Sequence, residues 1–196
     1  MNFFDDRSED RVVDEFLVMR CQMGDKTALS ALITKWQSPF MRYASVITRD
    51  PTLAADVVQE AWIKIIRSLP RLREPRKFPA WAYRIINHQS MDALRAIKPT
   101  APETEEPDTS GIRELEAKEQ VWVVLEQLSP EHRSVLALHY LQGFEVKEIA
   151  GIVQKPEGTI KSRLFNAREK FRLMLETAPE QDKYHNNQSN NQHNRR

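Results

Sequence analysis

A helix near the C-terminal end of the chain carries side chains suited to reading the edges of DNA base pairs. It is expected to begin near Pro156, after a short helix over residues 145–153 and a tight connection at Gln154 and Lys155. Ile160 and Leu164 recur at the spacing i, i+4, which predicts the face that packs inward. The other faces combine short polar side chains for base edges with Lys and Arg for phosphates. The residues expected to contact DNA are Thr159, Lys161, Ser162, Arg163, Phe165 and Asn166.

The overall charge of the chain does not by itself indicate a nucleic-acid partner. The formal net charge is only +1, from 29 Lys and Arg against 28 Asp and Glu. A DNA-binding surface must therefore come from local clusters of charge. The spacing alone leaves open the alternative that this helix is the basic surface of an ordinary helical hairpin.

A second basic cluster lies in the first half of the chain and has a different character. Residues 71–77 carry several cations opposed only by Glu74, and the aromatic residues Phe78, Trp81 and Tyr83 follow at once. Cations bind the phosphates of single-stranded nucleic acid, and flat rings stack on its unpaired bases. The alternative is that Trp81 and Tyr83 belong to the core and the arginines are merely solvated. The candidate residues are Arg71, Arg73, Arg76, Lys77, Trp81, Arg84, Asn87 and His88.

Amphipathic helices are expected to position both clusters. In the first block, over residues 14–97, Ala28, Leu32, Trp36 and Phe40 recur every four residues, as on one face of a helix. Asp50 followed by Pro51 is typical of a helix start. Four helices are predicted, over residues 14–20, 25–47, 52–69 and 78–97, and four such helices can share one core.

The second block, over residues 114–176, is also predicted to be helical. Ser129 and Pro130 mark a helix start, and Gly143 marks an end. Predicted helices cover residues 115–128, 130–142, 146–153 and 156–176. Residues 98–113 form an acidic, Pro-containing linker, and the Asn- and Gln-rich residues 177–196 form a disordered tail. The predicted fold class is all-α, with two small helical domains, the second a helix-turn-helix domain, joined by a flexible linker.

Several classes of function lack the residues that they need. Cys21 is the only cysteine, so neither a disulfide framework nor a cysteine-based zinc site is expected. The histidines His88, His132 and His139 have no paired ligand spacing, and no catalytic constellation is present. We expect no cofactor, no metal and no enzymatic activity. With no signal peptide and no apolar run long enough to cross a bilayer, a cytoplasmic location without membrane insertion is predicted.

Three motifs resemble those of bacterial RNA polymerase sigma factors of the sigma-70 family. Residues 56–62, Asp-Val-Val-Gln-Glu-Ala-Trp, are similar to the helix with which these factors bind RNA polymerase. Residues 78–85 resemble the promoter-melting segment, and residues 128–133 and 157–164 resemble region four. The order of the motifs and the short linker are typical of the small extracytoplasmic-function (ECF) group. The resemblance covers residues 14–97 and 115–176.

The resemblance implies a role for each group of residues. Asp56, Gln59 and Glu60 would bind core RNA polymerase. The cations of residues 71–77, with Trp81, Arg84 and Asn87, would bind and open the −10 element by capturing flipped bases. Lys161, Ser162, Phe165 and Asn166 would read the duplex −35 element. An anti-sigma factor is an expected further partner, and the free chain is expected to be a monomer or to be held by that inhibitor.

Two other functions are weighed against this one. A DNA-binding regulator of another kind would use the first block for sensing or dimerisation, but it would not need the motif at residues 56–62 or the Trp81 segment. A helical enzyme would need a nucleophile with a base, or a cluster of carboxylates. Asn166 stands where Arg or His is frequent in the family, and because Asn can pair with adenine, the −35 preference is expected to differ from that of relatives.

Overall fold

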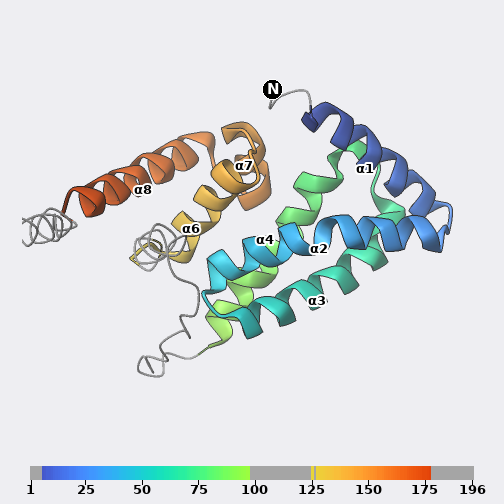
Figure 1. Ribbon diagram of the computed structural model, residues 1–196, viewed down its shortest axis with the longest axis horizontal. Coiled ribbons are helices and arrows are strands. Elements are labelled where there is room, and N and C mark those ends of the chain that lie inside the picture. The colour runs from blue at the N-terminus through green and yellow to red at the C-terminus, as the bar shows by residue number, and fades with distance from the viewer. Residues whose placement is uncertain (1–5, 98–124, 126, 178–196) are drawn as a thin grey trace, which may run out of the picture.

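The computed structural model describes residues 6–97, 125 and 127–177, and every regular element in these ranges is helical (Figure 1). The expected all-α fold class is therefore confirmed. The predicted linker at residues 98–113 and the predicted tail beyond Thr177 lie outside the described residues, as does nearly all of the predicted helix over residues 115–128.

Four long helices form the first block, and capping residues fix where two of them begin. The Asp25 carboxylate accepts hydrogen bonds from the backbone N–H groups of Thr27 and Ala28. The Asp50 carboxylate caps its helix in the same way, and Pro51 occupies the first helical position, as predicted. The first helix begins well before the predicted residue 14. The four helices are α1 (Asp6–Gln22), α2 (Lys26–Thr48), α3 (Pro51–Ser68) and α4 (Phe78–Ala96).

Aromatic rings fill the centre of the first block. The rings of Phe40 and Tyr83 lie 5.2 Å apart and those of Tyr43 and Tyr83 lie 5.1 Å apart, both in edge-to-face geometry. The half-buried Trp36 donates from Nε1 to the carboxylate of Asp14 at 3.0 Å. Burial raises the pKa of Asp14, although hydrogen bonds from Lys35 and Trp36 oppose this. The predicted apolar face of α2 is confirmed as part of the core.

Three helices and a π-helical turn form the described part of the second block: α6 (Pro130–Leu136), the turn η3 (Ala137–Leu141), α7 (Val146–Val153) and α8 (Glu157–Thr177). Ser129 stands at the predicted N-cap of α6. However, its hydroxyl bonds with Nδ1 of His132 at 2.8 Å and does not cap the backbone. Gly143 ends the turn with φ +64°, a conformation that glycine adopts without strain.

The helices α7 and α8 form the predicted helix-turn-helix. Ile149 of α7 packs with Ile160, Leu164 and Ala167 of α8, and all four are buried. Glu145 and Glu148 form a capping box that fixes the start of α7. Gln154, in the left-handed conformation with φ 55°, makes the turn between the two helices. The inward face predicted from the spacing of Ile160 and Leu164 is confirmed.

The two blocks pack together, which the sequence did not predict. Helix α4 contacts α7, and α2 contacts α6 and η3 (Figure 1). The ring of Tyr83 in the first block lies 5.4 Å from that of Phe144 in the second, and buried residues of both blocks belong to one continuous apolar core. Within the described ranges, no helix is long and apolar enough to span a membrane.

Candidate nucleic-acid interface

The outward face of α8 carries all the residues that were predicted to contact duplex DNA. Lys161, Ser162, Phe165 and Asn166 are exposed, while Thr159 and Arg163 are half-buried at the edges of this face. Phe165 leaves 63% of its surface exposed, which is unusual for a phenylalanine in a packed helix. Since Ile160 and Leu164 face inward, α8 separates a packed face from a polar face that is free to enter a groove.

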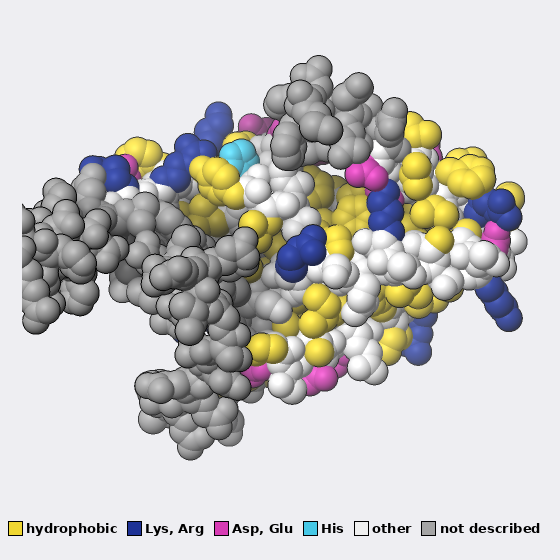
Figure 2. Space-filling view, in the orientation of Figure 1, with side chains coloured by type: hydrophobic (Ala, Val, Ile, Leu, Met, Phe, Trp, Pro, Cys, Tyr) yellow, Lys and Arg dark blue, Asp and Glu magenta, His cyan; other side chains and the backbone are white. Residues whose placement is uncertain are grey.

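Positive charge is concentrated around α8 although the whole chain is nearly neutral. Burial, together with the charges of Arg163 and Lys170, lowers the pKa of His132 on α6. Arg168 lies over the ring of Tyr140, 5.6 Å from its centre, and donates a hydrogen bond to the Tyr140 hydroxyl. Side chains of Lys and Arg gather over this helix (Figure 2). The local cluster therefore supplies the attraction to phosphates that the net charge does not.

Two short 3-10 turns present the second basic cluster, η1 (Leu69–Arg71) and η2 (Pro75–Lys77). Its four cations, Arg71, Arg73, Arg76 and Lys77, are all exposed. The Lys77 ammonium lies 2.7 Å from Glu74, and this hydrogen bond lowers the pKa of the Glu74 carboxyl. Gln22 of α1 donates from Nε2 to the backbone oxygens of Leu69 and Leu72, at 2.9 and 2.8 Å. This contact, which no sequence pattern predicts, holds the cations at one end of the first block.

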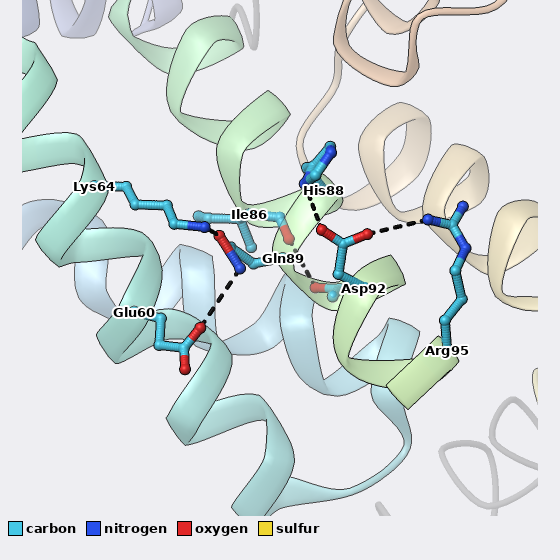
Figure 3. Close-up of polar contacts among 8 residues, drawn as sticks. Glu60, Lys64, Ile86, His88, Gln89, Asp92 and Arg95 are labelled. Carbon is cyan, nitrogen blue, oxygen red and sulfur yellow. Dashed lines mark hydrogen bonds and ion pairs between the residues drawn. The ribbon is translucent and has the colours of Figure 1, made fainter. Parts of the chain in front are cut away.

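The aromatic residues beside these cations divide between surface and core. Tyr83 is fully buried, so the core alternative is correct for that residue. Trp81 is half-buried with its ring 6.1 Å from that of Phe78, and one part of it remains open to a ligand. Arg84 and His88 are exposed on the outer side of α4. His88 contacts Asp92 at 2.8 Å, and Asp92 also binds Arg95 at 3.0 Å (Figure 3).

Asn87 differs from the other −10 candidates because its amide oxygen already has two partners. The Tyr43 hydroxyl donates to Oδ1 of Asn87 at 3.0 Å, and Ser134 of the second block donates to the same atom at 2.7 Å. The structure thus places Asn87 at the contact between the two blocks. The sequence did not predict that Tyr43 and Ser134 bind Asn87, because each lies among residues whose spacing predicts the buried face of a helix.

The outer face of α3 carries the residues of the proposed polymerase-binding motif. Asp56, Gln59 and Glu60 are exposed, while the alternating Val57, Val58, Ala61 and Trp62 are buried. Gln89 of α4 points toward α3, where it donates to Glu60 at 3.5 Å and accepts from Lys64 (Figure 3). Ile66, one turn after Trp62 on the same helix, is 39% exposed. The motif therefore presents a polar face with a partly apolar end.

None of these groups resembles a metal centre. Among the described residues, no cluster of three or more His, Cys, Asp or Glu side chains is arranged to hold a metal ion. Cys21 is half-buried, and burial together with the charge of Asp25 raises the pKa of its thiol, which disfavours the reactive thiolate. The chemistry available at these surfaces is the binding of charged and aromatic partners.

Comparison with known proteins identifies the family of the chain. The family models "Sigma-70 region 2" and "Sigma-70, region 4" match residues 32–99 and 118–171. The RNA polymerase sigma-H factor of Pseudomonas aeruginosa is 31% identical over 175 residues, covering 80% of this chain and 90% of that protein. The ECF RNA polymerase sigma-E factor of Escherichia coli K12 is 32% identical over 180 residues, covering 82% and 93%.

A solved structure shows the same fold at lower identity. The sigma factor RpoE of Bartonella quintana, solved in complex with the anti-sigma factor NepR, has a TM-score of 0.61 and is 18% identical; the match covers 77% of this chain and 98% of that one. Two family models in the expected order, together with relatives matched over nearly their whole length, identify the family. The chain belongs to the ECF group of the sigma-70 family, the initiation factors, not themselves enzymes, that bind core RNA polymerase and direct transcription from specific promoters.

Proposed function

We propose that three separate surfaces divide the work of this sigma factor. The polar face of α3, with Asp56, Gln59 and Glu60, binds core RNA polymerase. The cations at residues 71–77, with Trp81, Arg84, Asn87 and His88 of α4, bind and open the −10 element. The outer face of α8 reads the −35 element. The domains that carry these surfaces span residues 14–97 and 114–176, and residues 98–113 and 177–196 are their linker and tail.

The observation that carries the proposal is the separation of faces on α3 and α8. On α3, Asp56, Gln59 and Glu60 are exposed while Val57 and Val58 between them are buried. The same separation on α8 leaves Lys161, Ser162, Phe165 and Asn166 exposed. A polar face that no other part of the described structure covers is available to a macromolecular partner.

The −10 step depends on electrostatics and stacking. The exposed cations at residues 71–77 attract the phosphates of the strand, and the partly open ring of Trp81 offers a surface for an unpaired base. Opening the duplex is then driven by binding energy, since a base that is captured outside the helix cannot pair again.

A protein inhibitor and a cytoplasmic location are the remaining parts of the proposal. The Bartonella sigma factor was solved in complex with an anti-sigma factor, which supports a similar protein inhibitor for this chain. Such an inhibitor would compete with core polymerase for the chain. We place the chain in the cytoplasm, because core polymerase and promoter DNA are found there.

Reconstituted transcription tests the proposal. The purified chain, added to core polymerase and promoter DNA, should give transcripts with a defined start; absence of any such transcript would contradict the assigned function. The double variant Asp56→Ala/Glu60→Ala should raise the Kd for core polymerase at least about tenfold, equivalent to about 1.4 kcal/mol. Glu169→Ala, which removes an exposed carboxylate of α8 that pairs with Arg172, is the matched control and should leave core affinity unchanged.

A further inference from the structure

The domain that holds the −35 helix is packed against the helix proposed to open the −10 element. Helix α4 contacts α7, and Tyr83 of α4 packs its ring on Phe144 while donating from its hydroxyl to Oε1 of Gln142. At the rim, the guanidinium of Arg11 lies 3.2 Å from the carboxylate of Glu148. These contacts hold α4 and α8, which carry the two proposed DNA-binding surfaces, in one packed unit.

A buried polar triangle lies at the centre of this contact. The hydroxyls of Tyr43 and Ser134 lie 2.9 Å apart, and they lie 3.0 and 2.7 Å from Oδ1 of Asn87, to which each can donate its one proton. Tyr43 and Ser134 are buried, and burial raises the pKa of Tyr43, so its hydroxyl keeps its proton. When both hydroxyls donate to Oδ1 of Asn87, its two lone pairs are occupied and it has no acceptor capacity left for DNA.

A buried arginine provides a second attachment between the blocks. Arg133 of α6, which is only 5% exposed, donates from Nη2 and Nε to the backbone oxygen of Ile47, at 2.6 and 3.2 Å. Ile47 lies in the last turn of α2, where carbonyl groups have no intrahelical partner and the helix dipole favours a cation. Arg133 also donates from Nη1 to the backbone oxygen of Leu128, at 2.7 Å. Although burial lowers the pKa of Arg133 to about 10, the group stays charged at neutral pH.

In this packed arrangement, the distance between α4 and α8 is shorter than the distance between the −10 and −35 elements of a promoter. The names of the −10 and −35 elements place them about 25 base pairs apart, which at about 3.4 Å per base pair is roughly 85 Å of duplex. Helix α4 packs on α7 and α7 packs on α8. Because the axes of adjacent helices lie about 8–10 Å apart, the two packing steps from α4 to α8 together span roughly 20 Å. One chain cannot reach both elements until the blocks separate.

We infer that the structure is a closed, self-inhibited state of this sigma factor, held by an interdomain latch formed by Arg133 and Ser134 of α6 on Ile47, Tyr43 and Asn87 of the first block. Opening the latch releases Oδ1 of Asn87 for the −10 strand and lets α8 move to the −35 element. The inference rests on the proposed function, which assigns the two DNA elements to α4 and α8.

A reversible bridge across the rim tests this inference. In a Cys21→Ser background of the full chain, Arg11→Cys and Glu148→Cys place thiols at the positions whose side chains meet in the closed state. The probe is dithiobismaleimidoethane, a bismaleimide with a central disulfide that reductant cleaves. The readout is transcription from promoter DNA by the chain with core polymerase, before and after reduction. The two single-cysteine variants, treated with the same reagent, are the controls.

The bridged chain should lose transcription at least tenfold relative to both controls, and reduction should restore it. A bridged chain that transcribes as well as the controls would overturn the latch, and so would failure of the two thiols to bridge. Failure of the proposed function looks different, because the unbridged chain would then give no promoter-specific transcript either.

Discussion

Asn166 and Lys161 are the residues that we propose to determine the base preference of α8. Both are exposed and lie on the polar face opposite Ile160 and Leu164. Asn pairs through two hydrogen bonds with adenine, and Lys donates to guanine. Contacts of this kind differ from phosphate contacts because they discriminate between bases.

We expect Asn166→Ala or Lys161→Ala to cost about 1–3 kcal/mol of binding at particular −35 positions. Lys170→Ala, farther along the same helix, should weaken all sequences about equally, since it lies beyond the base-reading part. Measuring affinity for a set of −35 duplexes, each with one base pair changed, separates the two behaviours. An equal loss across the whole set for Asn166→Ala would mean that Asn166 contacts only the backbone.

Arg133 is the residue on which stability depends most directly. Its guanidinium satisfies the backbone oxygens of both Ile47 and Leu128. Replacing it with methionine keeps much of the volume but leaves two carbonyl groups unpaired, each costing about 1–3 kcal/mol where water cannot reach. We expect Arg133→Met to lower the free energy of unfolding by about 2–4 kcal/mol in urea denaturation. Arg67→Met, at an exposed arginine of α3, should stay within about 0.5 kcal/mol of the parent chain.

At the scale of elements, helix ends position the proposed binding surfaces. The Asp50 carboxylate accepts from the N–H groups of Thr52 and Leu53 at 2.8 and 3.0 Å, which fixes where α3 begins. Burial of Val57, Val58, Ala61 and Trp62 on one face of this helix leaves Asp56, Gln59 and Glu60 facing outward. The Asp50 cap thus stabilises the helix that carries the proposed polymerase-binding face.

We expect Asp50→Ala to lower the free energy of unfolding by about 1 kcal/mol, because two N–H groups of the first turn lose their acceptor. Asp50→Asn keeps an acceptor at the same place and should lose little. Chemical denaturation of the three chains measures the difference. Equal stability of the alanine and asparagine variants would show that the side-chain cap contributes nothing to α3.

At the scale of the whole molecule, the balance between a closed and an open arrangement depends on the apolar core that the two blocks share and on a few polar groups beside it. The hydroxyls of Tyr43 and Ser134 can be removed with little change of volume, by Tyr43→Phe and Ser134→Ala. Each hydrogen bond lost weakens the closed state by about 0.5–1.5 kcal/mol. Together the changes should shift the equilibrium toward the open state by about tenfold.

The double variant should therefore show a larger radius of gyration than the parent chain in small-angle X-ray scattering. Ser68→Ala is the control, because the Ser68 hydroxyl bonds within α3, to the backbone oxygen of Lys64. Identical scattering curves for the parent chain, the double variant and the control would contradict a latch at this position.

The sequence by itself determined the helices and their faces. The spacing of Ile160 and Leu164 is a local property of a 3.6-residue helix, and it predicted which side of α8 would be free. The three sigma-like motifs determined the family in the same way, because each is a short contiguous run. The cap at Asp50 could also be predicted from the sequence, since a cap and its helix are adjacent in the chain.

Only the tertiary structure decided how the two blocks meet. Tyr43 and Ser134 are 91 residues apart, and Arg133 is 86 residues from Ile47. The sequence around each of these residues predicts only its own helix. A periodic pattern within one helix cannot predict a contact with a helix so distant in sequence. Asn87 is an example. Its residue type and position predicted a side chain free to bind DNA, whereas in the structure its amide oxygen accepts from Tyr43 and Ser134. Burial against another element depends on three-dimensional proximity, which a helical period does not encode.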